Sequence, residues 1–524
     1  MAATAVSATA EHTTSLPNTR TSSPIPFSRH STPPPASKPI PEDFRSSLAA
    51  WWNNASYKEA RFAEERLLRR MEIFRPSPPE PAKGWFGWST SQPVVKPTHE
   101  DDVRAEARGP VTGSGLVATL RNVFVPTPNP DAAPGHPADP VVSGSSPASS
   151  LSEKSKHRLS LHKKNQGKLV DYINTMEISS PDNEKSKEAV VVLHGYAAAM
   201  GFFFRNWESI AQTGSESGRR TFFLDWLGMG LSSRPSPNLL SSPSSATIPN
   251  RVSRAEHFFL SSLESWRESV GVDKMVLVGH SLGGYLASAY AVRYPDRVSG
   301  LILVSPAGVP HGPDYKRYPT SEEGNLDEAV NAANAELNQG QREAKGEAKE
   351  WQKSREESAT RKYMMKFFVW SWEKGVSPFA FLRNMGPWGP MFAARYTQRR
   401  FSAQSEEDRR DIHAYIYNTS ILKGSGEYCI SHLLAPGAYA RIPIVDRINK
   451  VKVPVTFMYG DNDWMDVDGG HASVAELKKA GNHQGQVHVV PKAGHHLYLD
   501  NPEVTNRLIS DAIKALPKIS QAAQ

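Results

Sequence analysis

Short apolar runs of strand length alternate along the chain with longer segments of helical character. The runs occupy residues 189–193, 220–224, 275–278, 453–459 and 487–490. Tyr285–Ala291, which follows the third run, is typical of a buried helix. Because continuous apolar runs indicate strands buried on both faces, the pattern predicts an α/β fold with a mostly parallel central sheet and helices on both faces.

Low-complexity segments interrupt this pattern. Residues 126–168 are rich in Pro, Ser and Ala and predict a disordered insertion. Residues 321–358 mix Glu, Lys, Ala and Gln, which indicates a charged insertion that is either a solvated helix or disordered. Residues 1–43 are rich in Ala, Ser, Thr and Pro with few acids, and they fit either an organellar presequence or a disordered tail.

Residues 44–76 carry a helical pattern with two adjacent tryptophans. Phe44, Leu48, Trp51 and Trp52 are apolar, and several arginines follow them. An amphipathic helix of this composition suits a membrane surface. Packing of the same helix onto the core is the alternative.

Composition narrows the classes of function. The 524 residues include 61 Lys and Arg against 54 Asp and Glu, a net charge of +7, which suits anionic lipid surfaces. No basic stripe joins a known nucleic-acid module, so nucleic acid is not an expected partner. Cys429 is the single cysteine, which excludes an internal disulfide framework and favours a reducing compartment or the mitochondrial interior. No apolar run approaches the roughly 18 residues of a membrane-spanning helix.

The strongest chemical signal is a G-x-S-x-G motif between a strand and a helix. Gly279 and Gly283 surround Ser281, directly after the apolar run 275–278. Glycines allow the sharp turn that lifts a serine hydroxyl above the edge of the sheet. Ser281 is therefore the candidate nucleophile.

A nucleophilic serine needs a base and an acid that orients the base. The run 453–459 ends in a loop with three aspartates, Asp461, Asp463 and Asp466, and His495 follows the run 487–490. Because these loops lie at the carboxyl ends of strands, we expect the acid and the histidine to face Ser281 at one edge of the sheet.

The run 189–193 ends in His-Gly and small residues, which is typical of an oxyanion loop. The backbone N–H groups of Tyr196 and Leu282 are the expected oxyanion donors. A G-x-G after the run 220–224 lacks the rest of a dinucleotide-binding motif and predicts a tight turn. No metal or organic cofactor is expected.

These motifs, in this order, resemble an α/β-hydrolase subfamily. It contains comparative gene identification-58, the N-acyl-phosphatidylethanolamine phospholipase and the fungal mitochondrial cardiolipin-specific deacylase. The supporting stretches are residues 265–268, 272–275, 279–283, 293–298, 305–308, 459–466 and 495–500, with the Trp-bearing segment 51–70. The subfamily's hallmark H-x4-D corresponds to His495 and Asp500.

The resemblance implies a domain plan and a catalytic acid. The hydrolase core would comprise residues 108–308 and 441–518, with an inserted helical cap at 309–440. Asp463 takes the position at which this fold carries its acid. Aromatic and basic residues are dense in 361–401, where the cap would line an acyl tunnel with a phosphate-attracting rim.

The implied activity is that of a serine hydrolase acting on acyl esters of phospholipids or lysophospholipids at an anionic membrane surface, as in cardiolipin remodelling. One alternative is an acyl-CoA-dependent lysophosphatidic acid acyltransferase that uses H-x4-D, with acyl-CoA as co-substrate. A second is a non-catalytic lipase co-activator, which Ser281 argues against. The resemblance favours a peripheral enzyme of the mitochondrial inner membrane; the cytoplasm or a lipid-droplet surface is the alternative.

Overall fold

The structure is a computed structural model. It describes residues 33–54, 57–75, 115–134, 169–240, 242, 246–312, 359–373, 375–402 and 404–519. Residues 1–32, residues 135–168 of the first predicted insertion and the charged insertion 321–358 lie outside the described residues.

The described residues form one eight-stranded sheet with the order β1-β2-β4-β3-β5-β6-β7-β8. The strands are β1 (Val117–Pro126), β2 (Leu169–Ser179), β3 (Glu188–Leu193), β4 (Arg220–Leu224), β5 (Lys274–His280), β6 (Val298–Val304), β7 (Val455–Gly460) and β8 (Gly485–Val490). β2 pairs antiparallel with both β1 and β4, and the remaining pairs are parallel. The five predicted runs correspond to β3, β4, β5, β7 and β8, so the predicted fold class is confirmed.

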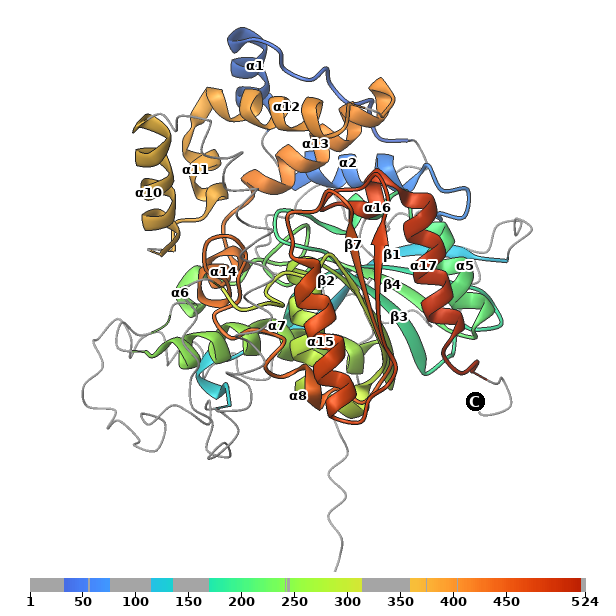
Figure 1. The fold of residues 1–524 in the computed structure, drawn as a ribbon. Coiled ribbons are helices and arrows are strands. Elements are labelled where there is room, and N and C mark those ends of the chain that lie inside the picture. The colour runs from blue at the N-terminus through green and yellow to red at the C-terminus, as the bar shows by residue number, and fades with distance from the viewer. Residues whose placement is uncertain are drawn as a thin grey trace, which may run out of the picture.

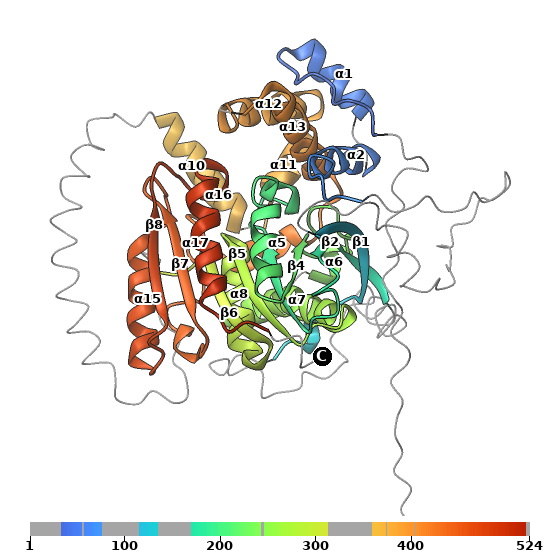
Figure 2. The same cartoon turned by 90° about the vertical axis from the view of Figure 1, so that its right-hand side faces the viewer.

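Helices cover both faces of the sheet (Figures 1 and 2). They are α5 (Trp207–Glu216), α6 (Pro237–Leu240), α7 (Ile248–Ser269), α8 (Leu282–Arg293), α15 (Val467–Lys479), α16 (Leu497–Asp500) and α17 (Pro502–Lys514). In β3, Val191 and Leu193 pack in the hydrophobic cluster with α7, α8 and α15, whereas Val190 and Val192 pack in the cluster with α5 and α17. This burial on both sides explains the continuous apolar runs.

The described part of the segment between β6 and β7 supplies four helices that lie above the carboxyl ends of the parallel strands (Figure 1). They are α10 (Ala359–Glu373), α11 (Pro378–Asn384), α12 (Gly389–Arg400) and α13 (Glu406–Ile421), and the short α14 (Ile430–Leu433) packs beside α7. We call α10–α13 the cap. A substrate that enters from the cap side therefore meets the edge of the sheet at which the predicted site residues lie.

The predicted single helix over 44–76 is wrong, because the structure has two helices, α1 (Phe44–Asn54) and α2 (Tyr57–Leu68). The chain leaves the helix after α2 because its backbone pairs with Ala118 of β1: the Arg75 N–H donates to the Ala118 carbonyl and the Ala118 N–H to the Ile73 carbonyl, both at 2.9 Å. α2 packs on the core, with Leu67 and Leu68 buried.

α1 instead packs on the cap. The rings of Phe44 and Trp388 are 4.7 Å apart, and the Ser47 hydroxyl donates to the Pro387 carbonyl oxygen at 2.5 Å. Trp52 on the same helix is 77% exposed. The core-packing alternative therefore holds for α2, whereas the membrane-surface alternative stays a prediction for the exposed side of α1.

The predicted insertion 126–168 is partly structured. Residues Pro130–Ala132 form a short 3-10 helix, and Asp131 pairs with Arg254 of α7. The described part of this insertion therefore packs along α7 instead of forming a free loop.

Candidate active site

Ser281 lies at the turn between β5 and α8 in a left-handed conformation, with φ 53° and ψ −118°. Such a conformation is uncommon for a residue with a side chain, and it recurs at functional sites. The flanking glycines have no room for a side chain: a Cβ on Gly279 would lie 2.5 Å from the carbonyl oxygen of Gly283. The hydroxyl is thus held at the N-terminus of α8, where the helix dipole favours developing negative charge.

His495 connects Ser281 to Asp463. Its Nε2 lies 3.0 Å from the Ser281 Oγ, and its Nδ1 lies 3.3 Å from Oδ1 of Asp463. The three residues come from loops that follow β5, β7 and β8. The structure therefore brings together the three residues for which the sequence predicts nucleophile, acid and base.

The side chain of Asp463 is buried, yet the pKa of its carboxyl lies below the ordinary value. Burial by itself would raise that pKa, but hydrogen bonds from His495, Ser305 and the backbone N–H of Met465 outweigh it. The Met465 N–H donates to Oδ1 over 3.1 Å. Asp463 is thus ionised at neutral pH and able to orient the His495 ring.

The other two aspartates of the loop have structural partners. Asp461 accepts hydrogen bonds from two consecutive backbone N–H groups of the loop after β8, at 2.8 and 2.9 Å. Asp466 is the N-cap residue of α15. Among the described contacts neither reaches His495, so the geometry favours Asp463 as the acid.

The two predicted oxyanion donors lie beside the serine. Tyr196 follows β3, and Leu282 is the first residue of α8. A Cβ on Gly195 would lie 2.9 Å from the Cβ of Ser281, which shows how closely the loop after β3 approaches. Within the described part of the chain, neither N–H donates to a protein acceptor. Two unused N–H groups beside a serine hydroxyl suit stabilisation of an oxyanion.

Comparison with known proteins agrees with this arrangement. A family model described as alpha/beta hydrolase fold matches residues 188–502. That range covers more than half of the chain and includes Ser281, Asp463 and His495. The chain belongs to the alpha/beta hydrolase family.

Lipid-modifying proteins are among its relatives. The 1-acylglycerol-3-phosphate O-acyltransferase of Arabidopsis thaliana is 32% identical over 345 residues, which are 63% of this chain and 67% of the relative. The (lyso)-N-acylphosphatidylethanolamine lipase of Mus musculus is 30% identical over 342 residues, 63% of this chain and 80% of the relative. The 1-acylglycerol-3-phosphate O-acyltransferase ABHD5 of Rattus norvegicus is 28% identical over 334 residues, which are 63% of this chain and 78% of the relative. These relatives agree with the subfamily that the motifs resemble.

In this alpha/beta hydrolase, Asp500, the last residue of the H-x4-D motif, has two partners. Oδ2 of Asp500 accepts the Gly494 N–H at 3.0 Å, and Oδ1 pairs with Arg400 of α12 at 2.7 Å. The N-cap of α17 is Asn501, so Asp500 does not cap that helix. Asp500 steadies the loop that carries His495 and connects it to the cap.

Two further histidines pack around His495. Nε2 of His280 lies 3.0 Å from the carbonyl oxygen of His495, and the rings of His280 and His496 are 5.2 Å apart. Burial holds the pKa of both His280 and His496 well below the ordinary range, and the neighbouring His495 lowers it further. Both are neutral at physiological pH, so His495 is the one of the three that faces Ser281 as a base.

Sequence reasoning missed several residues of the site. Trp464 is 60% exposed, and its ring centre lies 5.0 Å from that of His495. The hydroxyl of Ser305 contacts both His495 and Asp463. For Ser305 the available signal was its position directly after a buried strand, since such positions gather at one edge of a parallel sheet.

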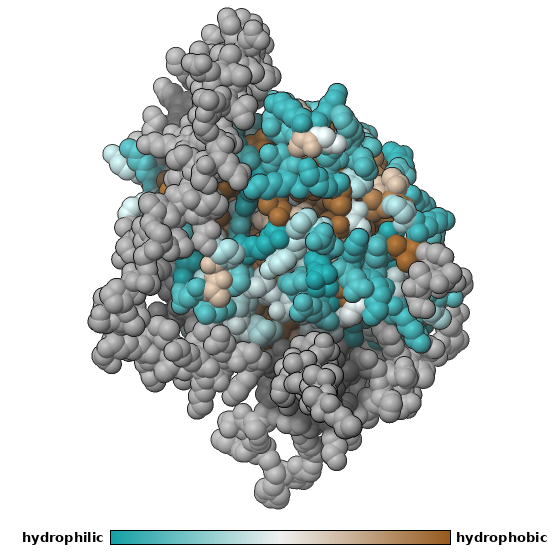
Figure 3. Space-filling model, turned by 90° about the horizontal axis from the view of Figure 1, so that it is seen from below, coloured by the Kyte–Doolittle hydropathy of each residue, from teal (hydrophilic) through white to brown (hydrophobic). Residues whose placement is uncertain are grey.

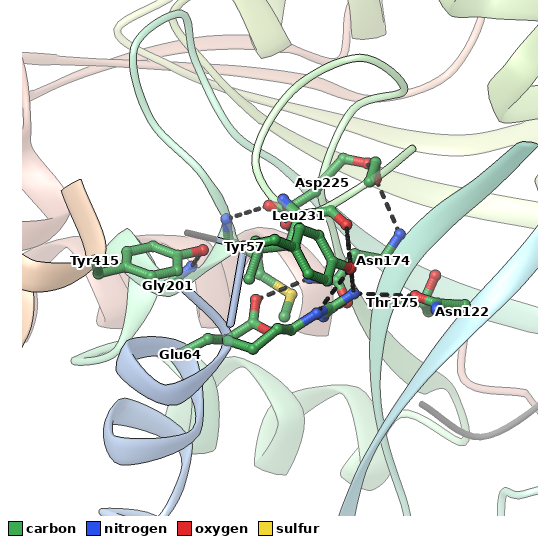
Figure 4. A network of polar contacts seen from close by, with 12 residues as sticks. Tyr57, Glu64, Asn122, Asn174, Thr175, Gly201, Asp225, Leu231 and Tyr415 are labelled. Atoms are coloured by element: carbon green, nitrogen blue, oxygen red, sulfur yellow. Dashed lines mark hydrogen bonds and ion pairs between the residues drawn. The ribbon is translucent and has the colours of Figure 1, made fainter. Parts of the chain in front are cut away.

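A buried polar network lies behind the oxyanion loop (Figure 4). Asp225, which follows β4, accepts the N–H groups of Met200 and Leu231, each at 2.8 Å. Asn174 of β2 donates to Asp225 at 2.9 Å and to Glu64 of α2 at 2.8 Å. The N-terminal helix α2 is thereby connected to the segment that follows the oxyanion loop.

A small pocket opens between the oxyanion loop and the cap. Its wall includes Tyr196, Met229 from the loop after β4, Phe379 of α11 and Thr419 of α13. The rings of Tyr196 and Phe379 are 5.4 Å apart. In the described part of the chain, no group of three or more His, Cys, Asp or Glu residues is arranged to hold a metal ion.

Proposed function

We propose that this alpha/beta hydrolase is a serine hydrolase that cleaves acyl esters of phospholipids or lysophospholipids at a membrane surface. The observation that carries the proposal is the 3.0 Å contact between the Ser281 hydroxyl and Nε2 of His495. It occurs at a strained turn beside two unused N–H groups, which is the arrangement that acyl transfer through a serine requires.

In the proposed reaction Ser281 attacks the ester carbonyl while His495 takes the serine proton. The N–H groups of Tyr196 and Leu282 stabilise the oxyanion, and the charge of Asp463 stabilises the imidazolium. His495 then returns the proton to the leaving alcohol. Water releases the fatty acid in a second round of the same steps, and neither a metal nor an organic cofactor takes part.

The substrate class is inferred from the relatives and from the exposed surface of the cap. The printed names of the relatives include a lipase for an N-acylated phospholipid and acyltransferases for a lysophospholipid. Tyr363, Phe367 and Trp370 are spaced four and three residues apart on α10, so they share one helix face, and they are 73%, 62% and 56% exposed. An exposed aromatic face beside a site entrance suits contact with lipid chains.

We further propose that the enzyme is peripheral to an anionic membrane, because basic residues lie among these aromatics. Lys366 lies on α10, and Arg395 lies over the ring of Phe392 on α12. None of the described helices is long and apolar enough to cross a bilayer. We propose the mitochondrial inner membrane as its location, on the resemblance to the subfamily together with the presequence-like composition of residues 1–43; the cytoplasm or a lipid-droplet surface is the alternative.

An acyltransferase is the second candidate, favoured by the names of two relatives. In that reaction the acyl group on Ser281 would pass to a lysophospholipid, with acyl-CoA as donor. The contacts of Asp500 with Gly494 and Arg400 do not favour a separate dyad of His495 and Asp500. A non-catalytic role is not favoured, because Ser281 has its base in contact.

Mass spectrometry of lipids incubated with the purified protein tests these proposals. Cardiolipin, phosphatidic acid and lysophosphatidic acid are presented with and without acyl-CoA, to wild type and to Ser281→Ala. We expect wild type to release fatty acid without acyl-CoA and Ser281→Ala to be slower by about 10⁴-fold or more, because triad residues act as a unit. Near-wild-type turnover by Ser281→Ala would overturn the serine mechanism, and product formed only with acyl-CoA would favour the acyltransferase.

A further inference from the structure

A second serine lies inside the candidate site, between the acid and the base. Ser305 directly follows β6 and is fully buried. Its Oγ is 2.6 Å from Nδ1 of His495 and 2.5 Å from Oδ2 of Asp463. The direct separation of His495 Nδ1 from Asp463 Oδ1 is longer, at 3.3 Å. The closest oxygen to Nδ1 is therefore the hydroxyl oxygen, not the carboxylate.

The protons of these groups allow one consistent assignment. An ionised carboxylate only accepts hydrogen bonds, so the Ser305 O–H must donate to Asp463. The Ser305 oxygen then has its lone pairs toward His495 and accepts from the Nδ1–H. A proton kept on Nδ1 leaves Nε2 unprotonated, which is the tautomer that accepts a proton from Ser281.

We propose that Ser305 is a positioning residue that joins Asp463 to His495 in a relay of four residues, Ser281–His495–Ser305–Asp463. This inference rests on the proposed serine hydrolase function. The proton of Ser281 moves to Nε2 of His495 and no further. Ser305 and Asp463 keep their own protonation states, and they stabilise the imidazolium by accepting from Nδ1–H and by charge.

The backbone around Ser305 is built to hold the hydroxyl in this place. Ser305 has φ 45°, a left-handed conformation that is uncommon for a residue other than glycine and recurs at functional sites. Its N–H donates to the Met458 carbonyl of β7 at 2.7 Å, and two residues on, the Ala307 N–H donates to the Ser281 carbonyl at 3.1 Å. The segment that carries Ser305 is thus bonded on both sides of this residue to the backbone of Ser281, since the Ser281 N–H also donates to the Val304 carbonyl at 3.0 Å, and this fixes the hydroxyl of Ser305 relative to the nucleophile.

The test measures kcat/KM against pH for a water-soluble p-nitrophenyl ester with the full chain, comparing wild type with Ser305→Ala. Ser262→Ala is the matched control, because Ser262 is equally buried but bonds within α7, to the Phe259 carbonyl. We expect Ser305→Ala to lower kcat by roughly 10- to 100-fold with little change in KM, less than the ~10⁴-fold effect of losing an orienting acid. We also expect the acid limb of the kcat/KM profile to move to lower pH. The imidazolium of His495 loses the Ser305 oxygen as an acceptor for its Nδ1–H, so the protonated form is less stable.

A rescue experiment separates positioning from packing. Asp463→Asn is compared with the double variant Asp463→Asn/Ser305→Asp, in which the carboxylate is placed at the position beside Nδ1. We expect the double variant to be at least about tenfold more active than Asp463→Asn alone. If Ser305→Ala unfolds at a lower temperature than wild type, Ser305→Gly, which tolerates φ 45°, is measured in its place with the same expectation.

Two kinds of failure are distinguishable. The relay would be overturned if Ser305→Ala kept its activity within about threefold of wild type with an unmoved acid limb, and if the double variant showed no rescue. Ser281→Ala would stay inactive in that case. Undiminished hydrolysis by Ser281→Ala would instead overturn the serine mechanism on which the relay rests.

Discussion

The two ring nitrogens of His495 have different neighbours, and this asymmetry defines the residue's role. Nε2 faces Ser281, whereas Nδ1 faces the oxygens of Ser305 and Asp463. The neighbouring His280 contacts the backbone carbonyl of His495 through Nε2 at 3.0 Å, and the two rings pack 4.8 Å apart. The carboxylate that faces Nδ1 therefore decides the orientation of the His495 ring, and substitution of the three aspartates in the loop after β7 tests which of them it is.

Asn substitution at each aspartate of that loop identifies the acid. Asp463→Asn is expected to lower kcat for a water-soluble ester by about 10³- to 10⁴-fold, because the orienting charge is lost. Asp461→Asn and Asp466→Asn are matched controls and are expected to retain activity within about tenfold of wild type, since these residues bond to backbone N–H groups. If Asp466→Asn is the most damaging of the three while thermal stability is unchanged, Asp463 is not the acid.

Local pattern was sufficient to single out Ser281 and His495, whereas it left three aspartates open, and the family resemblance pointed to Asp463 among them. Ser281, Asp463 and His495 each follow an apolar run, and their order along the chain matches a known catalytic order. Ser305 also directly follows a buried strand, but the pattern indicated neither its contacts nor those of Arg400. Their contacts join segments far apart in sequence, and a pattern of strands does not say which side chain at a strand end turns toward another loop.

Helix α2 shows how a charged pattern can mislead. Its arginines suggested a membrane-facing helix, but Arg61 is buried and its guanidinium donates to Glu64 at 3.0 Å and to Asn174 of β2 at 2.7 Å. Burial raises the pKa of Glu64 from 4.5 to about 7, although the charge of Arg61 opposes the shift. The partner on β2 lies more than a hundred residues away, so the helix sequence by itself did not indicate it.

The raised pKa of Glu64 predicts a pH dependence of stability. A carboxyl whose pKa is higher in the folded than in the unfolded state binds more protons when folded, so its contribution is fully present below about pH 4.5 and is lost as the pH rises through about 7. Glu64→Gln mimics the protonated form. We expect the melting temperature of Glu64→Gln to vary less than that of wild type between these pH values.

Glu72→Gln, which changes an exposed carboxyl of the same segment, is the control and is expected to follow wild type. Thermal unfolding at a series of pH values measures the difference. Parallel curves for wild type and Glu64→Gln would mean that Glu64 is ionised in the folded protein across the whole range.

The ion pair between Arg400 and Asp500 connects cap helix α12 to the loop of His495. Both side chains are partly exposed, so the pair is expected to contribute about 1 kcal/mol or less to stability. We expect Asp500→Asn to lower ester hydrolysis by less than about tenfold, because an amide oxygen still accepts the Gly494 N–H. A loss as large as that of Asp463→Asn would indicate that Asp500 takes part in the chemistry, as the acyltransferase alternative requires.

At the scale of the whole molecule, the exposed aromatic residues gather on one side. α1 and the cap helices α10–α12 lie together above the sheet (Figures 1 and 2), and they carry Trp52, Tyr363, Phe367, Trp370, Phe381 and Phe392 at the surface. The face seen from below shows predominantly hydrophilic residues with scattered hydrophobic ones, where it is not covered by grey atoms (Figure 3). The exposed aromatic residues are thus concentrated on one side of the molecule, and the entrance to the site lies on that side.

This one-sided distribution of exposed aromatic residues predicts how the protein binds a bilayer. A phospholipid does not leave the bilayer cheaply, since each exposed CH₂ costs about 0.8 kcal/mol, so the proposed function predicts that the cap side faces the lipid. We expect binding to vesicles that strengthens with cardiolipin or phosphatidic acid and weakens with salt, because Lys and Arg lie among the aromatics. The chain is expected to bind neutral phosphatidylcholine vesicles more weakly in the same sedimentation assay.

The tryptophans of α1 provide the sharpest test of this orientation. Trp51→Ala/Trp52→Ala is expected to weaken vesicle binding by roughly tenfold, because burying an aromatic side chain contributes on the order of 1–2 kcal/mol. Hydrolysis of a short, water-soluble ester should be unchanged, since α1 packs on the outside of the cap, above α12 and α13 (Figure 1). Val489→Ala is the control, as Val489 is exposed on the outer strand β8 and should not affect binding. Equal loss on vesicles and on the soluble ester would mean that these tryptophans hold the cap together, and the membrane role of α1 would be wrong.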